Sequence, residues 1–273
     1  RRQRQMCIRD RGYSANALGG AGGPLAVLII AIMASELGKA VSKETRVDIL
    51  VTPLVTIFSG VGLSMLIAAP IGAAASQVGT LIMWATEQAP LVMGILVSVI
   101  VGVALTLPIS SAAICAALGL TGLAGGAAVA GCCAQMIGFA VMSYKENGVG
   151  GLVSQGLGTS MLQMGNIVKN PRIWIAPTLA SAITGPLATC VFHFEMNGAA
   201  VSSGMGTCGL VGQIGVYTGW VSDIAAGTKA AITPMDWAAM VLLCFVLPAV
   251  LSVIFCEIER KLGWIKEGDL KLN

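Results

Sequence analysis

The sequence has few charged residues and few aromatic residues. Only 11% of its 273 residues are charged and 5% are aromatic, whereas 56% are hydrophobic. A soluble domain carries roughly 25% charged residues, with which it covers its surface. The shortage of charge excludes an ordinary soluble globular protein and indicates that lipid surrounds much of the chain.

Residues typical of metal, disulfide and catalytic sites are also scarce or dispersed. There is one histidine, and the eight cysteines form no CxxC pair. We therefore expect no metal site, no disulfide framework and no cofactor. No P-loop and no nucleophile beside a base is visible, which disfavours a self-sufficient enzyme or an ATP-driven pump. The basic residues form short clusters and no extended face, so we expect no nucleic-acid partner.

Long apolar runs predict an all-α, polytopic transmembrane protein with broken helices. A spanning helix needs roughly 20 apolar residues. Pro70 lies within one overlong run and predicts a helix followed by a broken or tilted piece. The ranges in which we expect spans are 20–38, 49–84, 90–107, 118–144, 173–194 and 237–256.

Two segments do not read as simple spans. The range 106–120 contains Pro108 where the preceding helix should end, and it predicts either a re-entrant hairpin or a plain turn between helices. The range 151–171 mixes polar and apolar residues, so it predicts either an interfacial segment or the wall of a polar cavity. We expect loops at 86–88 and 145–151.

Basic clusters predict the orientation of the chain. The range 39–48 contains three basic residues, which marks the cytoplasmic side, and the basic residues after Glu257 predict a cytoplasmic C-terminus. Residues 1–12 resemble a translated sequencing adapter, and we expect them to be a non-native leader. The membrane domain is then 13–266, incomplete at its N-terminus, and 267–273 is a cytoplasmic tail.

A polar cluster at membrane depth is the first candidate for a binding site. His193 lies two residues before Glu195 and four before Asn197. An ionised side chain at a helix centre costs roughly 2.5–3.5 kcal/mol, so such residues normally face a cavity or a partner. Their donors and acceptors suit a substrate with neighbouring hydroxyl groups, such as a sugar. Alternatively, Glu195 and His193 bond to each other or to the backbone and contact no ligand.

Gln163 and Asn166 are further candidates for substrate binding, because they precede the proline-containing span and could share its cavity. We expect Glu36 to be an interfacial cap or an ion pair, and Glu87 to lie in an exposed turn. A gate or a close approach of backbone to substrate is expected at Pro108, Pro186, Gly198, Gly204 and Gly206.

Glycines 206, 209, 212 and 215 recur at a spacing of three residues. This spacing predicts either a discontinuous helix near the substrate or close packing of helices. The ranges 106–109 and 184–187 share the pattern T-x-P-aliphatic, a weak sign of an internal repeat.

Several stretches resemble a known family. They are TPLVTIFSGVGLSMLIAAPIG, LTLPISSAAICAALGLTGLAGGAAVAGC, GTSMLQMGNIVKNPRIWIAPTLASAITGP and FHFEMNGAAVSSGMGTCGLVGQIG. With them, nearly all of the range 13–266 resembles the second family of phosphotransferase-system enzyme IIC membrane proteins, which includes proteins similar to the perfringolysin regulator. In better-known IIC families a membrane-embedded Glu and His contact the sugar, and Glu195 and His193 are the matching residue types here.

The resemblance implies a multi-pass sugar permease of the bacterial inner membrane. Its partners would be IIA and IIB proteins that relay phosphate from phosphoenolpyruvate, and the chain could form a homodimer. The sequence contains no IIB-like domain with a phospho-accepting cysteine, so phosphorylation would require a separate protein. Two alternatives stay open: an ion-coupled secondary transporter of a small metabolite, and a membrane-embedded regulator.

Overall fold

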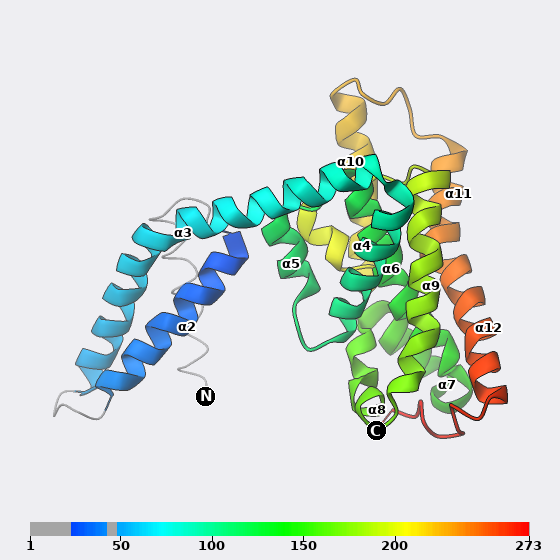
Figure 1. Cartoon of the computed structure of the whole chain (residues 1–273), viewed down its shortest axis with the longest axis horizontal. Coiled ribbons are helices and arrows are strands. Elements are labelled where there is room, and N and C mark those ends of the chain that lie inside the picture. The colour runs from blue at the N-terminus through cyan, green and yellow to red at the C-terminus, as the bar shows by residue number, and fades with distance from the viewer. Residues whose placement is uncertain (1–22, 43–47, 273) are drawn as a thin grey trace. The chain divides into compact units, whose positions relative to one another are not determined.

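The computed structural model describes residues 23–42 and 48–272, which are almost entirely helical (Figure 1). Among these residues, four helices are long and apolar enough to cross a membrane: Val51–Gln88, Gly122–Met142, Pro171–Val191 and Pro234–Lys261. Large apolar side chains such as Leu66, which is 75% exposed, are available to contact lipid. The prediction of an all-α polytopic membrane protein is confirmed. The expected leader, residues 1–12, and half of the expected cytoplasmic loop, residues 43–47, lie outside the described residues.

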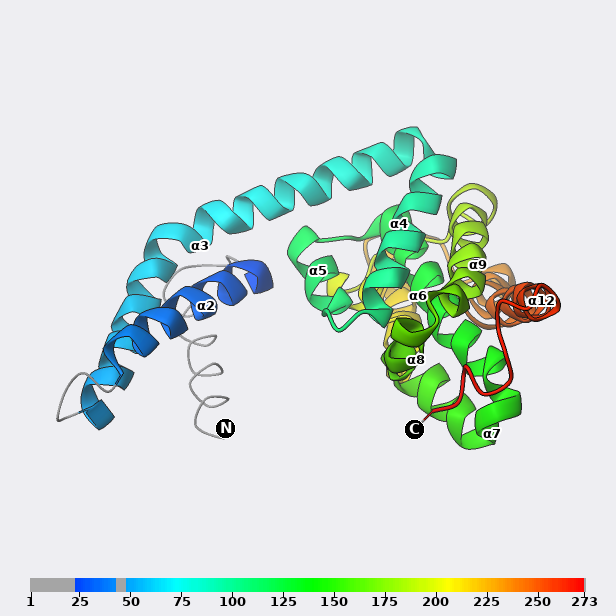
Figure 2. The same cartoon turned by 60° about the horizontal axis from the view of Figure 1, so that its bottom comes forward.

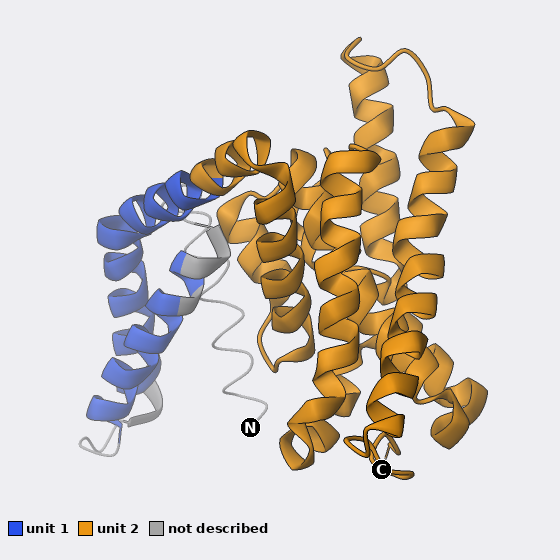
Figure 3. Ribbon diagram, turned by 45° about the vertical axis from the view of Figure 1, so that its right-hand side comes forward, with its two compact units in different colours: residues 1–79 blue, residues 80–273 orange. Residues whose placement is uncertain are grey.

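The chain divides into two compact units, residues 1–79 and 80–273 (Figure 3). The first contains α2 (Gly23–Val41) and most of α3 (Asp48–Gln88). Helix α2 covers the described part of the first predicted span, and its Ala26 and Ile30 pack with Ala68 of α3. Glu36 forms an exposed ion pair with Lys39, one of the two expected roles for Glu36.

Helix α3 corrects two expectations about the second apolar run. It continues through both Pro53 and Pro70 without a break, but it bends within the first unit, so the broken form is absent and the tilted form is present (Figure 3). The expected turn at 86–88 is the last part of this helix, and the chain instead leaves helical geometry at Ala89 (φ −135°, ψ 67°). A proline removes one backbone hydrogen bond, whereas a break in an apolar environment exposes several polar backbone groups, so the continuous helix is preferred.

The second unit combines regular helices with wide and tight helical turns. Its α-helices are α4 (Pro90–Thr106), α5 (Ser111–Leu118), α6 (Gly122–Met142), α7 (Tyr144–Val153), α8 (Met164–Lys169), α9 (Ile175–Pro186), α10 (Val211–Ala225), α11 (Pro234–Val241) and α12 (Leu247–Lys261). Its π turns are η1 (Ser154–Gly158), η4 (Leu187–Val191) and η7 (Leu242–Val246). Its 3₁₀ turns are η2 (Ser160–Gln163), η3 (Pro171–Trp174), η5 (Ala200–Gly204) and η6 (Cys208–Leu210).

Helix α6 forms the centre of the second unit, among α4, α9 and α12 (Figure 2). Its small residues allow neighbouring backbones to approach closely. A Cβ atom on Gly131 would lie 2.0 Å from the carbonyl oxygen of Ser98 in α4. The Ser98 hydroxyl in turn donates to the carbonyl oxygen of Ser181 in α9, at 2.8 Å. The glycine- and alanine-rich run therefore packs three helices at backbone distance, as polar and small residues do in membranes.

The range 106–120 is more than a plain turn between helices. After a loop that contains Pro108, the chain forms the short helix α5, whose first turn is capped by the Ser110 hydroxyl (3.2 Å to the Ala113 amide). The Ser111 hydroxyl donates to the carbonyl oxygen of Gly204 at 2.6 Å, so α5 is held against η5. The expected loop at 145–151 is also wrong: it lies within α7, which is kinked at Gly148 (φ 59°).

The two prolines of the T-x-P pattern have different surroundings. Pro108 lies in the loop after α4, whereas Pro186 is the last residue of α9 and is followed directly by the π turn η4. The helical path therefore extends past Pro186 to Val191. The shared pattern does not produce a shared local structure.

Candidate functional site

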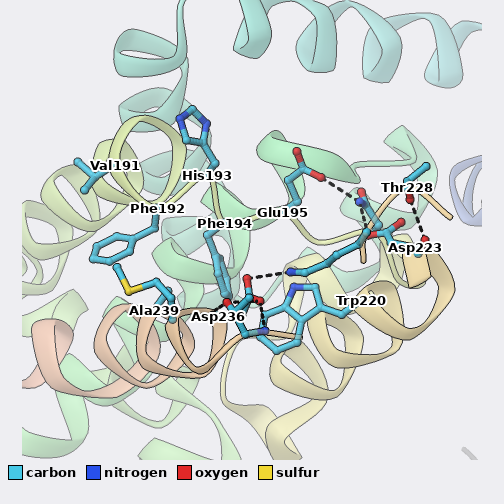
Figure 4. Close-up of a pocket in the computed structure, with 14 residues that line it drawn as sticks. Val191, Phe192, His193, Phe194, Glu195, Trp220, Asp223, Thr228, Asp236 and Ala239 are labelled. Atoms are coloured by element: carbon cyan, nitrogen blue, oxygen red, sulfur yellow. Dashed lines mark hydrogen bonds and ion pairs between the residues drawn. The ribbon is translucent and has the colours of Figure 1, made fainter. Parts of the chain in front are cut away.

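A cavity of about 560 Å³ lies where the end of η4, the end of α10 and the start of α11 meet (Figure 4). This volume is within the range of roughly 300–1,000 Å³ that small-molecule sites occupy. All three residues of the predicted polar cluster line it. The lining residues are Val191, Phe192, His193, Phe194, Glu195, Asn197, Trp220, Asp223, Thr228, Lys229, Thr233, Met235, Asp236 and Ala239.

The segment between η4 and η5 carries the polar cluster: the chain turns at His193, whose φ is 43°, and is extended around Met196, which pairs with Gly122. Its side chains alternate in direction, as they do in a strand. Phe194 and Met196 are buried at 3% and 0% exposure and belong to the hydrophobic core of the unit. His193 and Glu195 are exposed and Asn197 is half-buried, all on the cavity side. The spacing of two residues therefore brings the three polar side chains to one wall.

Helix α6 fixes the position of this segment. The amide of Met196 donates to the carbonyl oxygen of Gly122, and the amide of Gly122 donates to that of Met196, both at 3.0 Å. One helical turn further, a Cβ atom on Gly126 would lie 1.6 Å from the Phe194 carbonyl oxygen. Only a residue without a side chain allows the extended segment to lie this close to α6.

Asn197 joins two carboxylates at the cavity wall. Its Nδ2 donates to Oε2 of Glu195 at 3.0 Å and to Oδ2 of Asp223 at 2.9 Å. Within the described part of the chain no hydrogen bond links His193 to Glu195, so these two side chains do not satisfy each other. The imidazole and at least one oxygen of each carboxylate remain available to a ligand.

The opposite wall was not anticipated from the sequence. Lys229 Nζ lies 2.8 Å from Oδ1 of Asp236 and 5.0 Å from the ring centroid of Trp220. Asp236 also forms a capping box with Thr233 at the start of α11. The only hint in the sequence was the polar stretch between Trp220 and Trp237, which reads as an ordinary turn between helices.

The cavity wall is negatively charged. Its lining includes the carboxylates of Glu195, Asp223 and Asp236 and one ammonium group, Lys229, which is engaged by Asp236. The described residues contain no group of three or more His, Cys, Asp or Glu side chains that could hold a metal ion. The arrangement offers paired acceptors, an amide, an imidazole and the indole of Trp220, which together can hold a polar ligand with several hydroxyl groups.

The other two predicted substrate-binding residues lie elsewhere. Gln163 Nε2 donates to the carbonyl oxygen of Leu270 at 2.9 Å, and Asn166 Nδ2 donates to that of Lys271 at 2.9 Å. Neither side chain lines the cavity. Both instead hold the segment that follows α12.

The predicted gate residues contact the protein itself and do not line the cavity. A Cβ atom on Gly198 would lie 2.2 Å from the Gly215 carbonyl oxygen, and one on Gly204 would lie 2.5 Å from that of Ser111. Gly206 has a φ of 53° and packs against Cys132 of α6. Within α10, Gly212 packs against Gly206 and Gly215 packs against Ser202. Close packing, the second alternative for the spacing of the glycines, is therefore present, whereas none of the four lines the cavity.

Comparison with known proteins gives one match. The sequence model of the family described as "Phosphotransferase system, EIIC" matches residues 9–272. No curated protein and no solved structure matches the chain.

Proposed function

Because the chain belongs to the phosphotransferase system EIIC family and is a permease component of that system, we propose that the cavity binds the transported sugar. His193, Glu195 and Asn197 would hold the hydroxyl groups, and a separate IIB protein would phosphorylate the sugar. The observation that carries this proposal is the polar wall that His193, Glu195 and Asn197 form on one side of the segment between η4 and η5, while Phe194 and Met196 are buried on the other side. The candidate spans Pro171–Val191 and Pro234–Lys261 end and begin at this cavity, so it lies at one end of these helices, and irregular backbone is tolerated there because it lines a cavity.

The chemistry of the wall suits a sugar. The two carboxylates that share the Asn197 amide can each accept hydrogen bonds from neighbouring hydroxyl groups. Trp220 lines the same cavity, although it is 4% exposed and Lys229 lies over its ring. We propose that Asp223 is a further binding residue, because the Asn197 amide places it beside Glu195.

The distribution of basic residues supports an orientation for the second unit. The cavity end carries Lys229. The end formed by α7, α8 and the segment after α12 carries the basic residues Lys145, Lys169, Arg172, Arg260, Lys261, Lys266 and Lys271. By the positive-inside rule, we propose that this second end, with the C-terminus, faces the cytoplasm and that the cavity opens toward the outside.

Uptake measurements test the function. Membrane vesicles that contain the protein with IIA and IIB proteins should accumulate sugar phosphate only when phosphoenolpyruvate is supplied, and His193→Ala should weaken this uptake. Uptake that is abolished by an uncoupler and indifferent to phosphoenolpyruvate would contradict the proposal and favour an ion-coupled transporter. Specific binding of a partner protein without any uptake would favour a regulator.

Asp223→Asn should lower the affinity for the sugar about three- to tenfold. The substitution keeps the acceptor for Asn197 but replaces a charged hydrogen bond to the substrate with a neutral one, a difference of about 1 kcal/mol. Calorimetric titration of the purified protein with the sugar measures it. Glu87→Gln, which removes an exposed carboxylate away from the cavity, is the matched control. Equal affinities for the two variants would show that Asp223 does not contact the sugar.

A further inference from the structure

The segment 264–272 is firmly held at the end of the second unit that lies away from the cavity. The cavity is lined by residues at the start of α11, and the continuous helical stretch Pro234–Lys261 separates it from this segment. At 1.5 Å per residue this stretch is about 40 Å long. Ile265 and Leu270 are buried at 3% and 0% exposure, in one cluster with Cys256 of α12.

Side chains from other elements bind the backbone of this segment. The Leu270 amide donates to Oε2 of Glu146 at 2.8 Å, and the Leu270 carbonyl oxygen accepts from Asn147 Nδ2 at 2.8 Å and from Gln163 Nε2 at 2.9 Å. The Leu272 amide donates to Oδ1 of Asn147 at 2.8 Å. Glu146 is itself held by Arg260 of α12 at 3.1 Å. The segment is therefore fixed without being part of a helix or a sheet.

The same side chains connect the segment to the glycine-rich region. Gln163 Nε2 also donates to Oε1 of Gln155 at 3.0 Å. The next residue, Gly156, accepts a hydrogen bond at its carbonyl oxygen from the Thr207 hydroxyl at 2.6 Å. Thr207 follows η5, in the glycine-rich stretch that begins directly after Asn197. The π turn η1 thus lies between the bound segment and the stretch that leads to the cavity wall.

The two ends of the second unit differ in this structure. His193 and Glu195 are exposed at the cavity end, whereas Leu270 and Gln163 are fully buried at the other end. A permease must open its two ends in turn. Given the proposed function, we propose that the segment 264–272 is a latch that keeps the cytoplasmic end closed while the cavity is open to the outside, and that it detaches when that end opens.

The chemistry of the latch suits repeated release. Its contacts are mostly hydrogen bonds between side-chain amides and backbone, which water replaces when the segment leaves. Ile265 and Leu270 supply the buried apolar contacts. Cys256, 3% exposed in the same cluster, also lines a small cavity between α6, α7 and α12, so its labelling in the wild type is the baseline to which release of Ile265 and Leu270 would add.

Maleimide labelling of Cys256, located by mass spectrometry in the whole protein, tests the latch. Leu272→Pro removes the amide that donates to Asn147. We expect Cys256 to react several-fold faster in this variant, and the external sugar concentration for half-maximal uptake to rise by a similar factor, because the outward-open state is less populated. Lys271→Ala, which removes an exposed side chain and keeps the carbonyl oxygen bound by Asn166, should change neither value.

Faster labelling of Cys256 in Leu272→Pro with an unchanged half-saturating concentration would overturn the proposal, since the segment would then be a strap without a role in transport. Equal labelling of wild type and variant would also overturn it. Asn166→Ala is the second variant if Leu272→Pro is not recovered from membranes. Absence of uptake by the wild type would refute the proposed function instead, whereas the labelling comparison still reports whether the segment detaches.

Discussion

Glu195→Gln should lower the affinity for the sugar about 10- to 100-fold, the largest effect that we expect from a change of a single polar group. The substitution keeps the size of the side chain and an acceptor for Asn197. It removes the charge, which makes each hydrogen bond to the sugar about 1 kcal/mol stronger than a neutral one, and Glu195 would accept two of them. Titration calorimetry of the purified protein and the half-saturating concentration for uptake in vesicles measure the loss.

Glu87→Gln is the matched control for this variant. Glu87 is an exposed carboxylate in the last turn of α3 and does not line the cavity, so its replacement should leave the affinity unchanged. If Glu195→Gln also bound the sugar with wild-type affinity, Glu195 would have no contact with the substrate. Because Glu195 is exposed, its replacement should not affect folding. A loss of affinity can therefore be distinguished from a loss of folded protein.

A methyl group at position 126 of α6 should displace the segment that forms the cavity wall, because Gly126 packs against the core-facing side of that segment. In Gly126→Ala the new Cβ atom would lie 1.6 Å from the Phe194 carbonyl oxygen, so the extended segment must move away from α6. Overpacking of a core typically costs about 1–3 kcal/mol, and a clash with backbone belongs at the upper end. We expect a lower midpoint of thermal unfolding in detergent and a loss of sugar binding.

Gly62→Ala provides the comparison for this substitution. Gly62 lies in the apolar helix α3, and nothing is within 4 Å of a Cβ atom at that position, so alanine should be neutral or stabilising there. Wild-type stability and binding in Gly126→Ala would mean that the segment 194–196 does not lie against α6. A loss of binding with normal stability would still support the position of the wall.

The polar wall was predictable because its members are close in the sequence. Once the stretch after η4 is extended, alternation places Phe194 and Met196 in the core and leaves Glu195 and Asn197 together on the other side. The polar residues among apolar neighbours were sufficient to indicate a site. The extended backbone was not predictable, since it depends on the pairing of Met196 with Gly122, a contact distant in sequence.

Asp223 and Lys229 were not predicted, because their place at the cavity depends on how α10 packs against the segment that carries Asn197. The glycine face of α10 receives the extended segment: a Cβ atom on Gly219 would lie 2.8 Å from the amide nitrogen of Asn197. This approach brings the next turn of α10, with Asp223, to the Asn197 side chain. The spacing of glycines along a helix does not indicate which other segment of the chain packs against that face.

Gln163 and Asn166 were predicted to bind substrate, but in this structure their side-chain amides bind the protein backbone. Buried amides in a membrane domain indicate that something polar must satisfy them. The sequence suggested a substrate, whereas in this structure the polar partner is the backbone of Leu270 and Lys271. Residue type and burial are the same for both roles, so only the fold distinguishes them.

The π turns η1, η4 and η7 each contain more residues per turn than an ordinary helix. Deletion of one residue from η7 would convert it to a regular turn while α11 and α12 keep the same faces toward their neighbours. A deletion within α12 would instead rotate every following side chain by about 100°. Homologous chains that differ in length by one residue within the stretch Pro234–Lys261 should therefore carry the gap at η7.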